Sequence, residues 1–258
     1  MIGKTNIVGK PRTVPVLNGS YPADVTGKEV GSSATFEVKV ATDGYPAEYT
    51  YQWYVNGSAV SGATGASYTR SKLAMGTYTV YCMVTNKAGT TVSRTAKLTV
   101  TKQYLFRNGA FETISGLTRT NASQSISSGV ITLTASSRST YSLARSTEKV
   151  DLSSAKTLYI KFNSGSKTYR YSGGAYVGFG VTTATPSVGT DGGSQYKVTN
   201  SAAWKTFAHT ENNNAQPSGT LSLDVSGVAT SGYIVILFDS MEDYFNGVMK
   251  ISEIRLEG

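Results

Sequence analysis

The sequence predicts an all-β protein made of two β-sandwich domains, and three observations support this prediction. The 258 residues are rich in Gly, Ser, Thr, Tyr and Val, the composition of short strands joined by polar turns. Alternating apolar and polar residues recur along the chain, whereas Leu-, Glu- and Ala-rich helical runs are scarce. The length fits two domains of typical size, each large enough to bury its own core.

The first 24 residues predict an N-terminal arm, because Gly and Pro recur there without a clear periodicity. Two short apolar stretches, Ile7-Val8 and Val14-Pro15-Val16, could add a strand to the sheet edge of a neighbouring subunit. A terminus without fixed structure is the alternative.

Residues 25–101 predict the first sandwich. Apolar and polar residues alternate over 33–40, which predicts a half-buried strand. In 49–55, Trp53 falls in phase with Tyr51 and Val55, and Asn56-Gly57 then marks a tight turn. Further strands are expected at 67–70, 76–86 and 91–100.

Two motifs of this region resemble immunoglobulin-like domains. Tyr51-Gln-Trp53-Tyr-Val-Asn-Gly57 is similar to their central tryptophan strand, and Gly76-Thr-Tyr78-Thr-Val80-Tyr-Cys82-Met-Val84-Thr-Asn86 resembles the penultimate strand of bacterial and phage Ig-like modules and of PKD-type repeats. The resemblance implies an Ig-like β-sandwich over 25–101 and gives no ligand. The inter-sheet Cys pair of antibody domains is missing, because Cys82 is the single cysteine. Its phase with Tyr78 and Val80 predicts a buried, unreactive thiol.

Residues 102–258 predict a second sandwich of about eight strands without a helix, a jelly roll. The uninterrupted apolar run at 233–238 predicts a central strand. The other strands are expected at 130–134, 157–162, 175–181, 204–209, 221–225 and 248–256. Their order and the closing strand resemble the galactose-binding-like jelly rolls of carbohydrate-binding modules and phage structural proteins. No ligand-binding motif of that superfamily carries over to this sequence.

Aromatic residues of the second domain are the strongest binding signal, because sugars present C–H faces that stack on Tyr and Trp. Nearby amide side chains would bond the sugar hydroxyls. The glycan-binding candidates are Tyr169, Arg170, Tyr171, Tyr176, Tyr196, Trp204, Asn212 and Asn213. They form a glycan platform if residues 169–176 and 196–214 share one rim; plugging of the sandwich ends and contact with another subunit are the alternatives.

Catalytic and metal-binding patterns are scarce. The single histidine, His209, has no nucleophile motif near it, and no Cys or His spacing fits a metal site, so we expect neither an enzyme nor a cofactor. Asp239, Glu242 and Asp243 fall in one predicted loop, where they would either hold a structural Ca²⁺ or form a solvated acidic turn.

The net charge of +8 is spread along the chain, with ten Lys/Arg against five Asp/Glu in residues 1–101 and fourteen against eleven in 102–258. Without a basic run we expect no specific nucleic-acid recognition, although acidic polymers would be weakly attracted. No segment has the roughly 20 apolar residues of a membrane span, so no membrane insertion is expected. The N-terminus lacks the apolar stretch of a signal peptide, which predicts synthesis in the host cytoplasm.

Two classes of function fit these features. The first is a non-enzymatic bacteriophage virion accessory protein, decorating the capsid or attached to the tail. In this interpretation the arm or the Ig-like domain binds capsid or tail proteins, and the jelly roll adheres to host or environmental glycans. The second is a bacterial surface or secreted carbohydrate-binding protein that lacks its signal or its catalytic domain. Exposed sheet edges in both sandwiches are compatible with a homo-oligomer.

Overall fold

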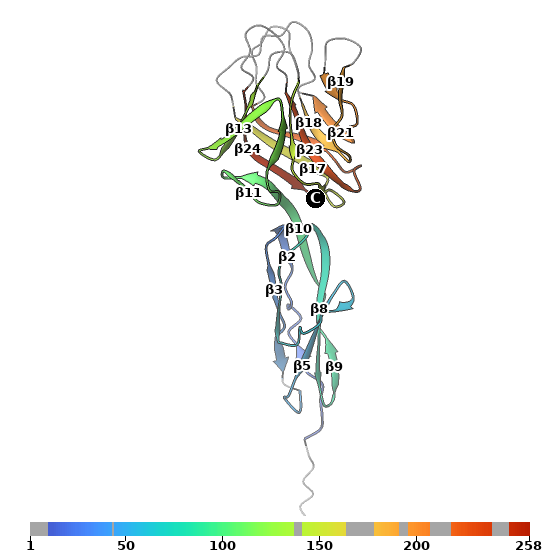
Figure 1. The fold of residues 1–258 in the computed structure, drawn as a ribbon. Helices are drawn as coiled ribbons and strands as arrows, with labels where there is room; N and C mark the ends of the chain where they lie inside the picture. Colours follow the sequence, from blue (N-terminus) through green and yellow to red (C-terminus); the bar gives the residue numbers. More distant parts are fainter. Residues whose placement is uncertain are drawn as a thin grey trace, which may run out of the picture. The chain divides into compact units, whose positions relative to one another are not determined.

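The computed structural model describes residues 10–42, 44–136, 141–163, 178–190, 196–206, 218–238 and 248–258. The regular elements of these ranges are β-strands, and the chain divides into two compact units, Met1–Thr101 and Lys102–Gly258 (Figure 1). Across the described ranges, no helix is long and apolar enough to cross a membrane. The predicted fold class, an all-β chain with an Ig-like sandwich followed by a jelly-roll sandwich, is confirmed.

The first unit is built from β-strands around one core, and the pairs whose register is described are antiparallel. Its main sheet contains β6 (Ser58–Ala59), β5 (Thr50–Val55), β8 (Gly76–Asn86) and β10 (Ala96–Arg107), with β9 (Gly89–Val92) paired to β8 and β2 (Val25–Glu29) paired to β10. Two further pairs are β3 (Ala34–Glu37) with β7 (Ser67–Arg70) and β1 (Val16–Leu17) with β4 (Val40–Thr42). β10 pairs with β8 over its first five residues, and its later residues belong to the second unit.

Two strands predicted as continuous are divided, so these predictions were wrong in detail. The segment 33–40 forms β3 and then β4, which pair with different partners, β7 and β1. The segment 91–100 is divided between β9 and β10 while both stay beside β8. Val92 pairs with Met83 and Ala96 with Val80, so three residues oppose two. This extra residue is a β-bulge, which local alternation does not reveal.

The sequence predicts an N-terminal arm over residues 1–24, but residues 13–17 form strand contacts within the first unit. Thr13 forms a β-bridge with Tyr45, and β1 pairs with β4. Asn86 Nδ2 donates a hydrogen bond to the Thr13 carbonyl at 2.9 Å, and Thr91 Oγ1 donates to the Pro15 carbonyl at 2.6 Å. These contacts join residues far apart in sequence, so no local pattern predicts them. Residues 1–9 of the expected arm lie outside the described residues.

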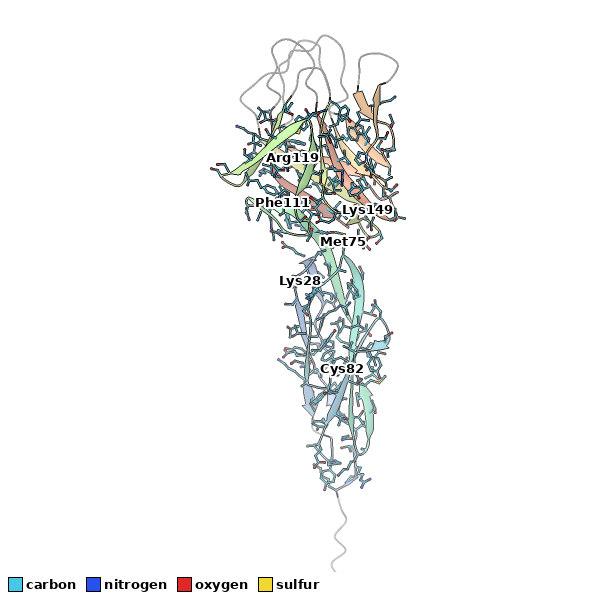
Figure 2. All side chains as sticks on the ribbon, in the orientation of Figure 1. Lys28, Met75, Cys82, Phe111, Arg119 and Lys149 are labelled. Carbon is cyan, nitrogen blue, oxygen red and sulfur yellow. The ribbon has the colours of Figure 1, made fainter. Side chains whose placement is uncertain are left out.

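The core of the first unit contains the side chains that the strand alternation predicts. Trp53 is fully buried, and its indole Nε1 donates a hydrogen bond to the Gly65 carbonyl at 2.9 Å. Cys82 is the residue opposite Trp53 in the β5–β8 pair, and it is also fully buried (Figure 2). The predicted burial of the thiol is therefore confirmed. Loss of water around the sulfur raises the pKa of Cys82 to about 11.

We expect Cys82 to be unreactive toward thiol reagents in the folded protein. With a thiol pKa of about 11, roughly one molecule in a thousand carries a thiolate at pH 8, and the sulfur is shielded from reagents. Ellman's reagent at pH 8 should detect no thiol in the native protein and one per chain in denaturant. Rapid reaction of the native protein would contradict the buried position.

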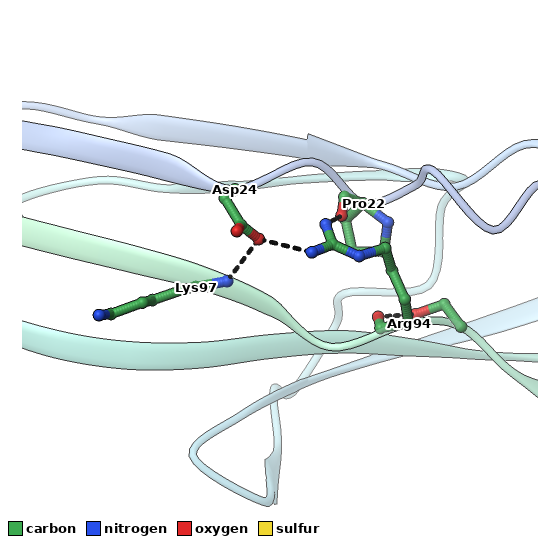
Figure 3. A network of polar contacts seen from close by, with 5 residues as sticks. Pro22, Asp24, Arg94 and Lys97 are labelled. Atoms are coloured by element: carbon green, nitrogen blue, oxygen red, sulfur yellow. Dashed lines mark hydrogen bonds and ion pairs between the residues drawn. The ribbon is translucent and has the colours of Figure 1, made fainter.

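A polar network fastens the entry of β2 to the main sheet (Figure 3). Asp24 Oδ1 accepts hydrogen bonds from the Lys97 backbone N–H at 3.0 Å and from Arg94 Nη2 at 2.9 Å. Arg94 Nη1 donates to the Pro22 carbonyl at 2.5 Å. The bond from Lys97 N–H, followed by that from Arg94, lowers the pKa of Asp24 below its ordinary value.

The Asp24 network predicts a pH-dependent stability contribution. A carboxyl whose pKa is lowered by folding stabilises the native state at pH values above its unfolded pKa of about 4. This stabilisation is lost as the pH falls through the pKa of the folded state. Asp24→Asn should therefore lower the melting temperature of the first unit at pH 7, with a smaller difference from the parent at pH 2.5. Calorimetry at both pH values tests this, and an equal difference at both would assign the effect to something other than ionisation.

The second unit is a sandwich of two antiparallel sheets. One has the order β13 (Ala122–Ser127), β14 (Val130–Ala135), β24 (Val248–Glu257), β17 (Thr157–Asn163) and β22 (Gly219–Asp224), with the end of β10 also paired to β24 and β11 (Ala110–Phe111) paired to β10. The other has the order β12 (Leu117–Thr120), β15 (Ser142–Ser146), β23 (Ser231–Phe238), β18 (Gly178–Thr182) and β21 (Ala203–Thr206), with β16 (Val150–Asp151) also paired to β23. β19 (Val188–Thr190) and β20 (Tyr196–Val198) form a separate hairpin.

The predicted central strand at 233–238 is confirmed, because β23 pairs with β15 on one side and β18 on the other. Several strands of this unit were not predicted: β11, β12, β13, β15, β16, β19 and β20. β12 and β13 are polar edge segments that follow each other through Asn121, which has a φ of 52°. Their Ser and Thr residues carry little apolar alternation, so periodicity does not identify them.

Candidate functional site

The β12-β15-β23-β18-β21 sheet has one face toward the sandwich core and one face away from it. Phe179 marks the core face, since its ring lies 6.1 Å from that of Phe162 on the opposite sheet. Strand alternation and cross-strand pairing then define the other face. We call it the aromatic face; its residues are Tyr141, Leu143, Arg145, Gly178, Gly180, Trp204, Tyr233, Val235 and Leu237.

The centre of the aromatic face is apolar and covered. Leu143, Val235 and Leu237 are buried, and they form one cluster with Val198 of the β19–β20 hairpin. Three aromatic side chains, Tyr141, Trp204 and Tyr233, are half-buried and pack around this cluster. The face therefore has a hydrophobic centre bordered by partly exposed rings, an arrangement suited to the apolar surface of a sugar.

Trp204, one of the predicted glycan-binding residues, lies across two glycines of the neighbouring strand β18. A Cβ added at Gly180 would lie 2.6 Å from Trp204 Cε3, and one added at Gly178 would lie 2.9 Å from Trp204 Cζ2. The indole can approach the β18 backbone this closely because both residues lack side chains. Trp204 thus packs against the β18 backbone and keeps only part of its surface exposed.

Tyr233 of the aromatic face lies beneath two cationic side chains. The Arg145 guanidinium carbon lies 4.4 Å from the centroid of the Tyr233 ring, and Lys149 Nζ lies 5.8 Å from it. Arg145 comes from β15. Lys149, which is labelled in Figure 2, follows that strand in the sequence. Sequence reasoning missed both cations and Tyr233 as site residues. For Tyr233, the available signal was the uninterrupted apolar run 233–238, because such a run implies that both faces of the strand are covered.

Most of the predicted glycan-binding residues lie outside the described residues: Tyr169, Arg170, Tyr171, Tyr176, Asn212 and Asn213. The backbone of Tyr196 is described in β20, but its side chain is not. The strand ends that flank these segments are described. Gly178 at the start of β18 pairs with Thr206 at the end of β21. Phe162 near the end of β17 pairs with Gly219 at the start of β22.

These strand ends face each other across the sandwich, because Phe162 and Phe179 are in ring contact. The described strand ends on either side of 164–177 and of 207–217 therefore lie at the same end of the second unit. The sequence hypothesis of one rim requires this arrangement. Tyr141, directly before β15, lies at this end as well, since Ser142 pairs with Phe238.

The predicted calcium ligands Asp239, Glu242 and Asp243 also lie outside the described residues, as does His209. Within the part of the chain that the structure describes, no three His, Cys, Asp or Glu side chains are grouped so that they could hold a metal ion. The described strands therefore offer no alternative metal site, and calcium binding at 239–243 stays a prediction.

The outer face of the opposite sheet is chemically different, because Arg255 and Arg107 there are paired with carboxylates. Arg255 lies over the ring of Tyr159 at 4.3 Å and forms ion pairs with Glu253 and with Glu257, the latter at 2.9 Å. Arg107 pairs with Glu112 at 2.6 Å. The guanidinium groups of this face already have carboxylate partners, so we place the candidate site on the aromatic face.

Comparison with known proteins gives no family. No family model matches the sequence, and no curated protein matches it. Solved structures give weak similarities. One of them is a structure of carbohydrate-binding modules from the β-sandwich superfamily, which is 16% identical to this chain. The alignment covers 95% of this chain and 98% of that structure, with a TM-score of 0.30.

Two other solved structures are similar at the same low level. SGBP-B from a complex xyloglucan utilization locus in Bacteroides uniformis is 9% identical, with 95% of this chain and 73% of that one covered and a TM-score of 0.24. A quinonprotein alcohol dehydrogenase-like protein from Bacteroides thetaiotaomicron is 18% identical over 46% of this chain, with a TM-score of 0.28. This chain spans 34% of the length of the latter. TM-scores this low carry no argument about the ligand or the activity of this chain.

Proposed function

We propose that this protein is a non-enzymatic accessory protein of a bacteriophage virion, on the capsid or the tail, whose second unit binds glycans of the host or the environment. The observation that carries the glycan-binding part is the aromatic face. Tyr141, Trp204 and Tyr233 are partly exposed around a buried apolar centre, and Trp204 packs closely against the β18 backbone at Gly178 and Gly180. Rigid, partly exposed rings favour stacking on a sugar, since little side-chain freedom is lost on binding.

The common end at which the described strand ends beside 164–177 and 207–217 lie supports the same proposal. A non-enzymatic role is consistent with the chemistry of Cys82, whose raised pKa and burial make the thiol a poor nucleophile.

The first unit offers a surface for docking to capsid or tail proteins. Among its described residues, the large exposed apolar side chains are Val14, Val16, Tyr45 and Val92. They belong to segments that are tied together, since Thr13 pairs with Tyr45 and Thr91 bonds to the Pro15 carbonyl. Grouped apolar side chains on a surface are typical of protein interaction sites. The same surface could also join copies of this chain into a homo-oligomer.

Binding of the full-length protein to a glycan array and to purified host cell walls tests the glycan-binding role. We expect saturable binding that Trp204→Ala weakens about tenfold or more, the loss typical of one stacking aromatic anchor. Tyr54→Ala removes a half-buried aromatic side chain from the first unit and serves as the control. Circular dichroism should show that both variants are folded. Binding unaffected by Trp204→Ala would exclude the aromatic face, and no binding to any glycan or wall would contradict the proposal.

Mass spectrometry of purified phage particles tests the virion role. The protein should be present in particles, and Val16→Ser combined with Val92→Ser should lower its incorporation. Both side chains are about half exposed, at 53% and 52%, so the double variant should stay folded. Absence of the parent protein from particles would favour the alternative, a bacterial surface or secreted carbohydrate-binding protein.

A further inference from the structure

Arg145 of the aromatic face and Lys149, which follows β15, form a cationic pair over one ring. Both lie over the Tyr233 ring, at 4.4 Å and 5.8 Å from its centroid. A flat guanidinium that stacks on an aromatic ring loses less freedom when it binds a ligand, because its orientation is already restricted. Tyr233 is thus a positioning residue for Arg145.

No described carboxylate neutralises this pair. The ion pairs among the described residues include neither Arg145 nor Lys149. The neighbouring acid Glu148 instead accepts hydrogen bonds from the backbone N–H and the hydroxyl of Ser115. The cross-strand neighbours of Arg145 are Thr118 and Val235, which are uncharged. Two positive charges are therefore left without a carboxylate partner in the described structure.

The Arg145 guanidinium also keeps hydrogen-bond donors for a ligand. Nη1 donates to the Ser146 carbonyl at 3.1 Å and to the Thr147 carbonyl at 3.4 Å, which fixes one edge of the group. A guanidinium has five N–H donors, and those on Nε and Nη2 make no bond to a described residue. An oxyanion with two oxygens matches this free edge.

We infer that Arg145 and Lys149 bind the acidic group of a glycan, a sugar carboxylate or phosphate, at the edge of the aromatic face. The inference rests on the proposed glycan-binding function and adds the class of ligand. The two cations lie beside partly exposed rings rather than along a basic track, and the Lys and Arg residues of 102–258 exceed the acidic residues by fourteen to eleven. This arrangement favours an acidic sugar over a nucleic acid, whose backbone needs a longer series of cations.

Affinity electrophoresis of the full-length protein tests the inference with three polysaccharides. Polygalacturonate supplies carboxylates, wall teichoic acid supplies phosphates, and neutral galactan is the uncharged reference. We expect at least one acidic polymer to bind about tenfold or more tightly than galactan, as expected for charge-assisted hydrogen bonds. The comparison between the two acidic polymers identifies the oxyanion.

Arg145→Gln combined with Lys149→Gln should abolish that preference, and Arg145→Lys should weaken it because the planar fork is lost. Lys161→Gln with Lys250→Gln removes the same charge from the opposite sheet and should leave the preference intact. Thermal unfolding checks that each variant is folded. Equal binding of galactan and both acidic polymers, or a preference that survives Arg145→Gln/Lys149→Gln, would overturn the inference while glycan binding stands. A parent protein that binds none of the three polymers would also overturn the inference, and the glycan array and cell-wall assay would then decide whether the proposed function stands.

Discussion

Replacing Trp53 with alanine should lower the free energy of unfolding of the first unit by about 3–5 kcal/mol, the range for a buried Trp. The side chain is fully buried among residues of β3, β5, β8 and β10. Its ring lies 5.9 Å from that of Tyr68. Its removal leaves a cavity and also deprives the Gly65 carbonyl of the Nε1 donor at 2.9 Å. In an immunoglobulin-like sandwich without a disulfide, this packing carries much of the cohesion.

Calorimetry of the full-length protein measures this effect. A loss of this size should move the transition of the first unit down by roughly 15 °C or more, since about 1 kcal/mol corresponds to about 4–8 °C in a domain of this length. Tyr54→Ala is the matched control. The Tyr54 ring stacks on that of Tyr81 at 4.8 Å but is half-buried on the outer side of the same strand, so the shift should be several times smaller. Equal shifts for the two variants would mean that Trp53 does not organise the core.

The contrast between Trp53 and Trp204 shows what the sequence can predict. Trp53 lies in an alternating strand, so its burial follows from local periodicity. The position of Trp204 depends on Gly178 and Gly180 of another strand, a tertiary relation without a local signal. Sequence reasoning therefore identified Trp204 as a candidate glycan-binding residue, but it did not predict that Trp204 packs across Gly178 and Gly180. The two strands are brought together only by the pairing of β18 with β21.

The same reasoning accounts for the other differences. The apolar run of β23 predicted a central strand, because both faces of that strand are covered by other elements. By contrast, the pairing of Val16–Leu17 with β4 depends on contacts between distant parts of the chain. Arg145 and Lys149 were missed for a similar reason, since only the folded chain brings them over Tyr233.

Gly180→Ala should strongly destabilise the second unit. An added Cβ would lie 2.2 Å from the Ala203 carbonyl oxygen, and Trp204 Cε3 is at 2.6 Å. The carbonyl belongs to the paired strand and cannot rotate away, so the backbone of β18 or β21 must shift. We expect a loss of about 3 kcal/mol, the upper end for overpacking, and a fall of about 6–12 °C in the melting transition of this unit.

Gly227→Ala is the matched control, because Gly227 has no atom within 4 Å of an added Cβ and does not have a positive φ. Its effect should be close to zero. The double variant Gly180→Ala/Trp204→Ala separates the two obstacles. If the Trp204 indole is the main obstacle to the added methyl group, the double variant should lose clearly less stability than the sum of the losses of the two single variants. If the Ala203 carbonyl is the main one, the losses add, and the glycine is required by strand pairing rather than by the tryptophan.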